Sequence, residues 1–157
     1  MLKRSAGILL YRVNHNGYEF LLAHPGGPFY KNKDIGIWTV PKGEFEENED
    51  PRDAAIREFR EELGADVSGE MIPLKPVFQK SGKEVLTWAV RGDLNPDKIV
   101  SNTFFLEWPP KSGKTQEFSE VDRVEWFDAD TAKKKILPAQ VNIIEELAIH
   151  LASSEDV

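Results

Sequence analysis

The sequence predicts an α/β protein in which a mixed β-sheet carries helices on its faces. Segments with strand character outnumber those with helical character, and turn residues connect the first two strands. Two segments, one near the middle of the chain and one near its end, space their apolar residues as an amphipathic helix does. Strands and helices interleaved in this way are typical of sheets covered by helices.

Length and composition favour one globular domain. The 157 residues, 40% of them hydrophobic, suffice for a single domain, residues 1–157, with its own core. The net charge of −7 argues against binding to duplex nucleic acid or to an anionic membrane. The sequence contains no cysteine, which excludes disulfides and thiolate catalysis. It shows no signal peptide or membrane span, so we expect a cytoplasmic protein. Its oligomeric state is left open.

The N-terminal third predicts a β-hairpin followed by a long loop. Ser5–Val13 is rich in Ile and Leu, Asn14–Gly17 is turn-like, and Tyr18–His24 returns as a second strand. Proline and glycine then interrupt residues 24–36, and we expect a loop there. A short strand is expected at Ile37–Val40.

The central helix has clear start and stop signals. Asp50 is a good N-cap, Pro51 suits the first helical position, and Gly64 suits the C-terminal stop after Leu63. Further strands are expected at residues 74–80, 84–91, 99–108 and 121–127, a short helix at 130–135, and a longer helix opened by Pro138.

Three carboxylates of the central helix lie on one face. Glu58, Glu61 and Glu62 are spaced i, i+3 and i+4, whereas Ile56, Phe59 and Leu63 form a separate apolar arc, with Ala55 at its edge. Like charges so close destabilise a helix unless a cation lies among them, and a hard divalent cation prefers oxygen ligands. The alternative is a solvated acidic face, which charge runs usually are.

The surrounding residues favour the metal site. Gly43, Glu49, Arg57, Glu58, Glu61, Glu62 and Gly64 match, at the required spacing, the signature of one family. That signature is G, five residues, E, seven residues, then R-E-U-x-E-E-x-G-U, with U aliphatic. Over residues 43–65 the chain thus resembles the Nudix (MutT-like) hydrolases. Phe59, an aromatic residue, and Ala65, a small residue, occupy the two U positions, and both are apolar.

The resemblance implies a fold, a reaction and a set of residue roles. The fold is an α/β/α sandwich, and the reaction is attack of water on a nucleoside diphosphate linked to another moiety, dependent on Mg²⁺ or Mn²⁺. The implied metal ligands are Glu58, Glu61 and Glu62 with the Gly43 carbonyl. Glu58 is the leading general base, and Glu61 is also assigned to catalysis. Arg57 is expected to pair with Glu49 as structural support.

Outside the signature, an acid from residues 116–122 is expected to join the site, as in many family members. Glu120 is the first choice as metal ligand or base, and Glu117 competes with it. Lys42 and Arg4 are expected to bind substrate phosphates. The three histidines, His15, His24 and His150, are assigned structural roles.

The expected substrate is a small nucleotide. Pro41-Lys42-Gly43 is similar to the dinucleoside polyphosphate hydrolases of the family, although these carry a tyrosine near position 82, where this chain has Gly82-Lys83. The favoured function is therefore a pyrophosphohydrolase acting on a (di)nucleoside polyphosphate. One alternative is a house-cleaning nucleoside triphosphate pyrophosphatase, and another is a nucleotide-binding or RNA-processing module.

Overall fold

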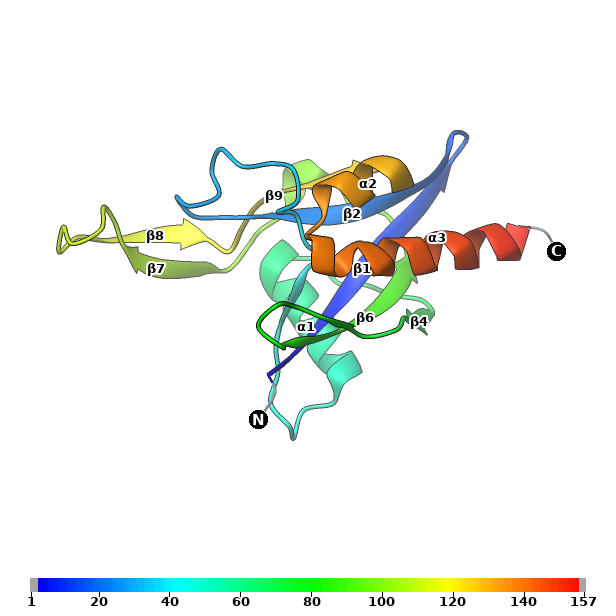
Figure 1. Ribbon diagram of the computed structural model, residues 1–157, viewed down its shortest axis with the longest axis horizontal. Coiled ribbons are helices and arrows are strands. Elements are labelled where there is room, and N and C mark those ends of the chain that lie inside the picture. The colour runs from blue at the N-terminus through cyan, green and yellow to red at the C-terminus, as the bar shows by residue number, and fades with distance from the viewer. Residues whose placement is uncertain (1–2, 156–157) are drawn as a thin grey trace.

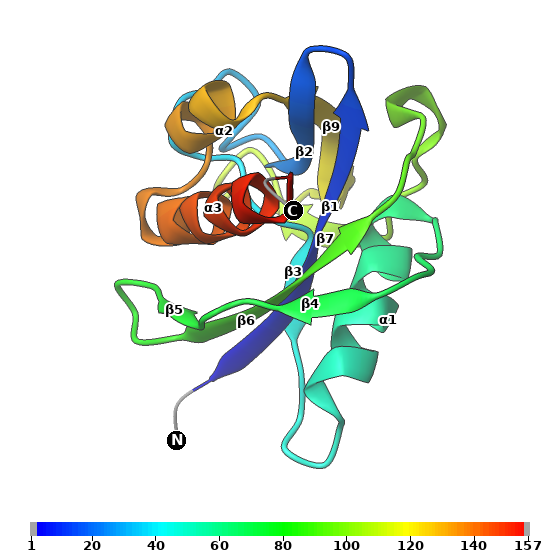
Figure 2. The same cartoon turned by 90° about the vertical axis from the view of Figure 1, so that its right-hand side faces the viewer.

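The computed structural model describes residues 3–155 and shows the predicted α/β/α sandwich (Figures 1 and 2). Figure 2 shows a twisted sheet with helix α1 (Pro51–Leu63) on one side and helices α2 (Ala129–Lys135) and α3 (Val141–Glu155) on the other. In the described residues, no helix is long and apolar enough to cross a membrane.

The main sheet is mixed. In residues 3–155 it has seven strands, in the order β4-β6-β1-β2-β9, with β3 also paired to β1 and β5 to β6. Strands β1 and β6 run parallel and the other pairs are antiparallel. The strands are β1 (Arg4–Asn14), β2 (Gly17–Pro25), β3 (Lys42–Glu44), β4 (Met71–Pro73), β5 (Val77–Phe78), β6 (Glu84–Arg91) and β9 (Val121–Phe127).

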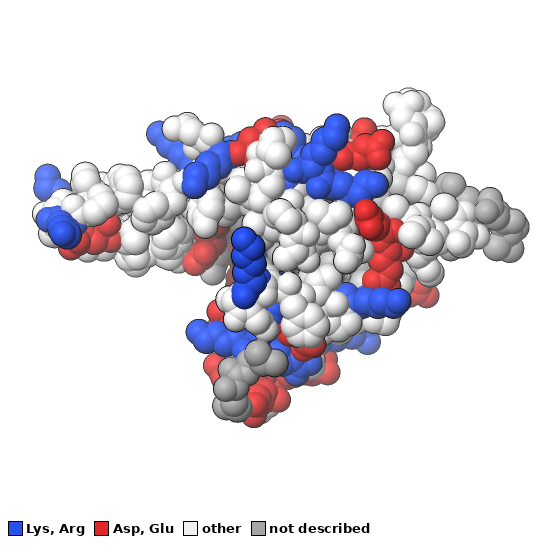
Figure 3. Space-filling model, in the orientation of Figure 1, with Lys and Arg blue, Asp and Glu red and all other residues white. Residues whose placement is uncertain are grey.

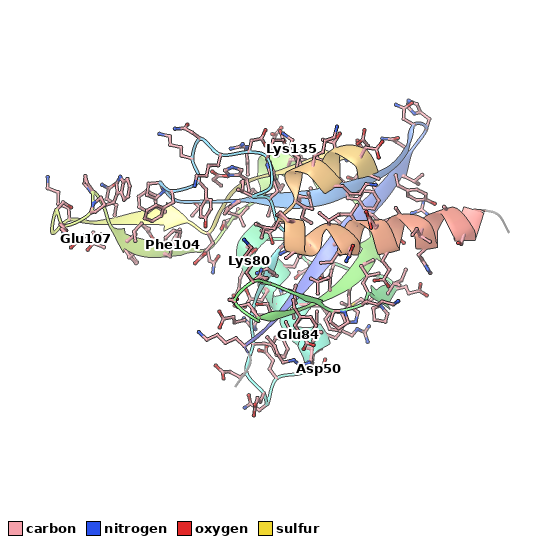
Figure 4. All side chains as sticks on the ribbon, viewed as in Figure 1. Asp50, Lys80, Glu84, Phe104, Glu107 and Lys135 are labelled. Carbon is pink, nitrogen blue, oxygen red and sulfur yellow. The ribbon has the colours of Figure 1, made fainter. Side chains whose placement is uncertain are left out.

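A separate two-stranded ribbon projects from the domain. Strands β7 (Thr103–Glu107) and β8 (Thr115–Ser119) pair with each other and extend away from the sheet, with Phe104 nearer its base and Glu107 nearer its tip (Figures 1 and 4). The predicted strand at 99–108 is thus confirmed only from Thr103. Residues 116–119, expected in a loop, form most of β8.

Two strand predictions fail for visible reasons. Ile37–Val40 is not a strand, because Trp38 and Thr39 each form only an isolated bridge, to Ile136 and Ala23. The regular pairing occurs instead at Lys42–Glu44. The strand predicted at 74–80 is replaced by the short strands β4 and β5, which pair with different stretches of β6. Pro73 and Pro76, which lack backbone N–H donors, punctuate this stretch.

Helix α1 begins at the predicted residue, α2 begins one residue before the predicted 130, and α3 begins at Val141 after a turn opened by Pro138. The Asp50 side chain accepts a hydrogen bond from the Asp53 backbone N–H at 3.1 Å, and Gly64 ends α1 in the left-handed conformation, with φ 70°. Asp128 caps α2 in the same manner as Asp50 caps α1. Pro138 opens a 3₁₀ turn, η2 (Pro138–Gln140), which continues into α3, and a second such turn is η1 (Pro96–Lys98).

The alternation of side chains along β1 divides the core into two layers. Ala6, Ile8 and Leu10 face α1, where they pack with Phe59 and Leu63. Leu9 and Tyr11 face the layer beneath α2 and α3, together with Ile143, Ile144 and Leu147. Burying both faces of β1 fixes its register, because a slip by one residue would exchange the two sets. Helix α1 is thereby held against β1 and β3, with its acidic residues toward β3.

Candidate active site

The first contact of the site joins β3 to α1. Gly43 pairs with Ala6 in the sheet, and its Cα faces the Glu58 carboxylate. A Cβ at position 43 would lie 2.5 Å from Glu58 Oε1 and still closer to Oε2. Only glycine therefore permits this approach, which brings a backbone segment against a carboxylate that is 9% exposed.

Arg57 connects the loop before the helix to the acidic face. Its Nε and Nη2 donate to the two carboxylate oxygens of Glu49, at 2.8 and 2.9 Å. This bidentate pair agrees with the support role predicted for both residues. Arg57 Nη1 also donates to Glu58 Oε1 at 2.8 Å and to Glu61 Oε1 at 3.2 Å. The guanidinium therefore partly neutralises the acidic face, which the sequence does not reveal.

Two of the three carboxylates are desolvated. The pKa of Glu62 is raised to about 8, mainly by burial and then by the nearby Glu58 charge, and Glu120 contributes in the same direction. The backbone N–H of Lys42 donates to Glu62 Oε1 at 3.3 Å and opposes this rise. Burial likewise raises the pKa of Glu58, against the effect of Arg57. Accumulated negative charge in a partly buried place favours a bound cation.

Lys42 lies on the opposite face of the sheet from Glu58. It pairs with Gly7, and a Cβ at Gly7 would meet Lys42 Cβ at 2.7 Å, so the glycine makes room for the lysine stem. Burial lowers the pKa of Lys42, and the charge of Lys83 lowers it further. In residues 3–155 no hydrogen bond is formed by the Lys42 ammonium group.

Two buried hydroxyls lie on the same face as Lys42. Ser5 lies two residues before Gly7 on β1 and therefore on the same face, and Thr87 of β6 pairs with Gly7. Ser5 Oγ and Thr87 Oγ1 are buried with no hydrogen-bond partner among the described residues. A buried hydroxyl without a protein partner requires a water or ligand oxygen.

The structure distinguishes the two candidate acids of residues 116–122. Glu117 lies on β8, where Thr103 Oγ1 donates to its carboxylate at 2.6 Å, out along the ribbon. Glu120 lies between β8 and β9 and is close enough to Glu62 to raise the pKa of that group. Only Glu120 is therefore brought to the acidic face of α1.

A series of backbone hydrogen bonds sets the position of Glu120. Asn102 N–H donates to the Glu61 carbonyl at 2.8 Å, and Glu120 N–H donates to the Asn102 carbonyl at 2.9 Å. Gly26 N–H in turn donates to the Glu120 carbonyl at 2.9 Å. A Cβ at Gly26 would clash with the Ser119 carbonyl, so glycine is needed for this packing. The sequence offers no local signal for Gly26 or Asn102, because their partners are distant in the chain.

Arg4 is placed differently from the other predicted residues. Its Nε donates to Glu84 Oε1 at 3.0 Å, and its guanidinium lies over the Phe45 ring, 5.2 Å from the centroid. The structure therefore engages Arg4 at the edge between β1, β3 and β6, whereas Lys42 keeps an ammonium group available to an anion.

The donor atoms of the site fit a hard cation. They are the carboxylates of Glu58, Glu61, Glu62 and Glu120 with the Gly43 carbonyl, all oxygen, as Mg²⁺ and Mn²⁺ prefer. In the described residues no three acidic or histidine side chains already converge as a metal site. Arg57 Nη1 donates to one oxygen each of Glu58 and Glu61, which leaves the second oxygen of each carboxylate for a cation.

Comparison with known proteins assigns the family. The family model described as the NUDIX domain matches residues 1–147. The chain belongs to the Nudix family. As a Nudix hydrolase it acts on acid anhydride bonds in phosphorus-containing compounds. The predicted family and fold class are thus confirmed.

Curated relatives of this Nudix hydrolase differ in substrate. It is 35% identical over 116 residues to the bis(5'-nucleosyl)-tetraphosphatase (asymmetrical) of Caenorhabditis elegans, covering 69% of the chain and 78% of the relative. It is 48% identical over 75 residues to the 8-oxo-dGTP diphosphatase of Proteus vulgaris, covering 46% of the chain and 54% of the relative. With an RNA pyrophosphohydrolase of Gluconacetobacter diazotrophicus it shares 46% identity over 41 residues, only 22% of that protein.

Solved structures of the Nudix fold align along nearly the whole chain. The Caenorhabditis elegans Ap4A hydrolase, in a binary complex, aligns with a TM-score of 0.65 at 24% identity, covering 95% of this chain and 98% of that one. The NUDIX domain of Shewanella oneidensis NrtR, complexed with ADP ribose, aligns with a TM-score of 0.64 at 15% identity, covering 96% and 89%. At these identities the likeness concerns the fold alone.

Proposed function

We propose that this Nudix hydrolase is a Mg²⁺- or Mn²⁺-dependent pyrophosphohydrolase that cleaves dinucleoside polyphosphates asymmetrically. The observation that carries the proposal is the convergence of Gly43, Glu58 and Glu62 at one side of β3 with Lys42 on its other side. The asymmetrical tetraphosphatase of Caenorhabditis elegans, 35% identical over 116 residues, supports the substrate class. We further propose that residues 1–157 act as one domain in the cytoplasm.

Glu58, Glu61 and Glu62, with the Gly43 carbonyl and Glu120, would hold the metal ion. When bound, Mg²⁺ supplies positive charge to the phosphate oxygens and to the bridging oxygen that leaves. Arg57 keeps the helix tied to Glu49 and sets the direction of Glu58 and Glu61. Removing Glu58 or Glu61 would also change how Arg57 is shared, because its Nη1 donates to both.

The remaining residues bind the substrate and move the proton. The Lys42 ammonium group, partly buried, neutralises a phosphate next to the bond that breaks. The hydroxyls of Ser5 and Thr87 would donate to an oxygen of the same phosphate or to a water between. Glu58, or Glu120 in its place, accepts the proton of the attacking water as its oxygen bonds to phosphorus and the P–O bridge breaks. The leaving nucleotide carries away the bridging oxygen.

The test is a substrate panel in ¹⁸O-labelled water with Mg²⁺. Diadenosine tetraphosphate should yield ATP and AMP, with the label on the phosphorus that water attacks. EDTA should abolish turnover, and Mg²⁺ should restore it. Glu61→Gln and Glu62→Gln should each lower kcat by at least about 10²-fold if these carboxylates stabilise the transition state. Wild-type rates in either variant would overturn the assignment of the site.

The same panel tests a second candidate, a nucleoside triphosphate pyrophosphatase. Identity of 48% over 75 residues to the 8-oxo-dGTP diphosphatase of Proteus vulgaris favours it. If triphosphates react to monophosphate and pyrophosphate while diadenosine tetraphosphate is inert, this candidate replaces the first.

A further inference from the structure

His24 lies outside the acidic cluster, in a fully buried position near the end of β2. Its Nε2 is 2.8 Å from the Lys33 carbonyl oxygen, and its Nδ1 is 2.8 Å from Asp122 Oδ1. The ring also packs edge-on against Trp38, with the centroids 5.0 Å apart. The imidazole therefore bridges two segments, the loop at 25–36 and the start of β9, which are distant in sequence.

Both nitrogens of the imidazole have an oxygen partner. A carbonyl oxygen only accepts, so Nε2 donates to Lys33, and Nδ1 forms the hydrogen bond with the Asp122 carboxyl group. Few side chains present two opposed hydrogen-bonding nitrogens on one rigid ring. Phe or Leu in place of His24 would leave the Lys33 carbonyl and the Asp122 carboxyl group without this partner.

Asp122 is the extra residue of a β-bulge. His24 pairs with Arg123, and Pro25 pairs with Val121, so Asp122 stands unopposed where the register shifts. A bulge bends its strand and re-aims the chain beyond it. Glu120 lies two residues before Asp122, directly before Val121.

The bulge and the backbone of Glu120 are connected on both sides. Pro25 is followed by Gly26, whose N–H donates to the Glu120 carbonyl, and the N–H of Glu120 donates to Asn102. His24, on β2, is hydrogen-bonded to Asp122, and Gly26, two residues later in the chain, is hydrogen-bonded to Glu120. The direction in which Glu120 enters the site depends on this pair of attachments.

We infer that His24 is a positioning residue, whose imidazole pins the Asp122 bulge and so directs Glu120 toward Glu62. The inference rests on the proposed function, in which Glu120 belongs to the metal site. His24 is not assigned a catalytic role, because its ring is fully buried and its two nitrogens are engaged by Lys33 and Asp122.

The experiment compares His24→Phe and the milder Asp122→Ala with Leu147→Ala. Leu147 is fully buried on α3, in the same core layer as Trp38, but it takes no part in the hydrogen bonds of His24, so its truncation supplies a loss of thermal stability with those bonds left in place. Amide hydrogen exchange, Mn²⁺ binding followed by electron paramagnetic resonance, and kcat and KM are measured for each. If His24→Phe does not fold, Asp122→Ala tests the same contact, because the Asp122 side chain is partly exposed.

The expected result is specific to the bulge variants. The Gly26 and Glu120 amides lose protection, and Mn²⁺ binds about 10–100-fold more weakly, as for partners that orient metal ligands. The fall in activity appears in kcat and not in KM, and it disappears in a Glu120→Gln background. Leu147→Ala changes none of these quantities at matched stability.

Failure of the His24 role and failure of the proposed function give different results in this experiment. If the Gly26 and Glu120 amides stay protected, or if both bulge variants bind Mn²⁺ as Leu147→Ala does, the role of His24 is overturned. If the wild-type protein binds Mn²⁺ but hydrolyses no phosphoanhydride, the proposed function fails, and exchange and Mn²⁺ affinity still decide the role of His24.

Discussion

Substitution of Gly43 by alanine should inactivate the enzyme with little loss of fold. The new Cβ would lie 2.5 Å from Glu58 Oε1 and closer to Oε2, whereas ordinary van der Waals contact begins at 3.4 Å. Even the farther oxygen must therefore retreat by about 1 Å. Displacements of that size typically lower catalytic rates by about 10²-fold, or about 2.7 kcal/mol of barrier.

The stability effect of Gly43→Ala should be much smaller. Gly43 has no positive φ, so alanine is not strained there. Overpacking against a buried side chain costs about 1–3 kcal/mol, and restriction of the unfolded chain offsets about 0.4–1 kcal/mol of it. The expected fall in Tm is therefore a few degrees, against a loss of about two orders of magnitude in activity.

The assay measures ATP and AMP released from diadenosine tetraphosphate with Mg²⁺, alongside Mn²⁺ affinity and thermal denaturation. Gly92→Ala is the matched control, because a Cβ there meets only the flexible end of Leu10, at 3.1 Å. It should retain wild-type kinetics. If Gly43→Ala also kept its rate and its Mn²⁺ affinity within about threefold, the close approach of Gly43 and Glu58 would have no part in the active enzyme.

Three further predictions concern binding and stability. Lys42→Met should raise KM by about tenfold or more, since a phosphate contact is lost, and a steady-state titration showing an unchanged KM would contradict that contact. Asp128→Ala should cost about 1 kcal/mol at pH 7, because the N-cap of α2 is lost. The Thr131 backbone N–H lowers the pKa of Asp128 below 3.8, so this difference should be full above about pH 4 and fade as the pH falls through the lowered value; urea titrations at several pH values measure it. Leu147→Ala should destabilise by about 2–5 kcal/mol in denaturant unfolding, and a smaller loss would mean that the layer beneath α3 repacks.

Local signals in the sequence predict the central helix well. Asp50, Pro51 and Gly64 specify its ends, and the helix spans Pro51–Leu63 as expected. Strands β6 and β9 also match their predicted ranges, since both are rich in buried β-branched and aromatic residues. In contrast, β8 has a single large apolar residue, Phe118, because it belongs to a two-stranded ribbon largely surrounded by solvent. No alternation marks it as a strand.

Local sequence patterns predict only part of the candidate site. The spacing of Glu58, Glu61 and Glu62 on one helix indicates a cation site, but the burial of Glu62 depends on packing against β3. The choice between Glu117 and Glu120 depends on the register of the ribbon, which pairs Glu117 with Phe105 and leaves Glu120 beyond its end. His24 and Asp122, separated by 98 positions, give no sign of their contact.

Charged side chains are unevenly distributed over the surface, which the net charge does not show. Lysine and arginine side chains gather over α2 and the neighbouring loop on the face shown in Figure 3, although the chain carries −7 overall. Lys135 is also paired with Asp34, which ties α2 to that loop. Lys80 lies at the turn between β5 and β6, in the middle of Figure 4. The net charge therefore does not describe the local potential on this face.

A backbone hydrogen bond joins the two ends of the ribbon where it leaves the domain. Asn102, just before β7, accepts from the N–H of Glu120, just after β8. Residues 103–119 therefore form an excursion whose two ends are fixed to each other. Insertions or deletions at its tip would leave Glu120 in place, as is common for loops that a rigid scaffold supports. The fold thus separates a constant reaction centre from an appendage free to vary in length, through which related enzymes could diverge in what they recognise.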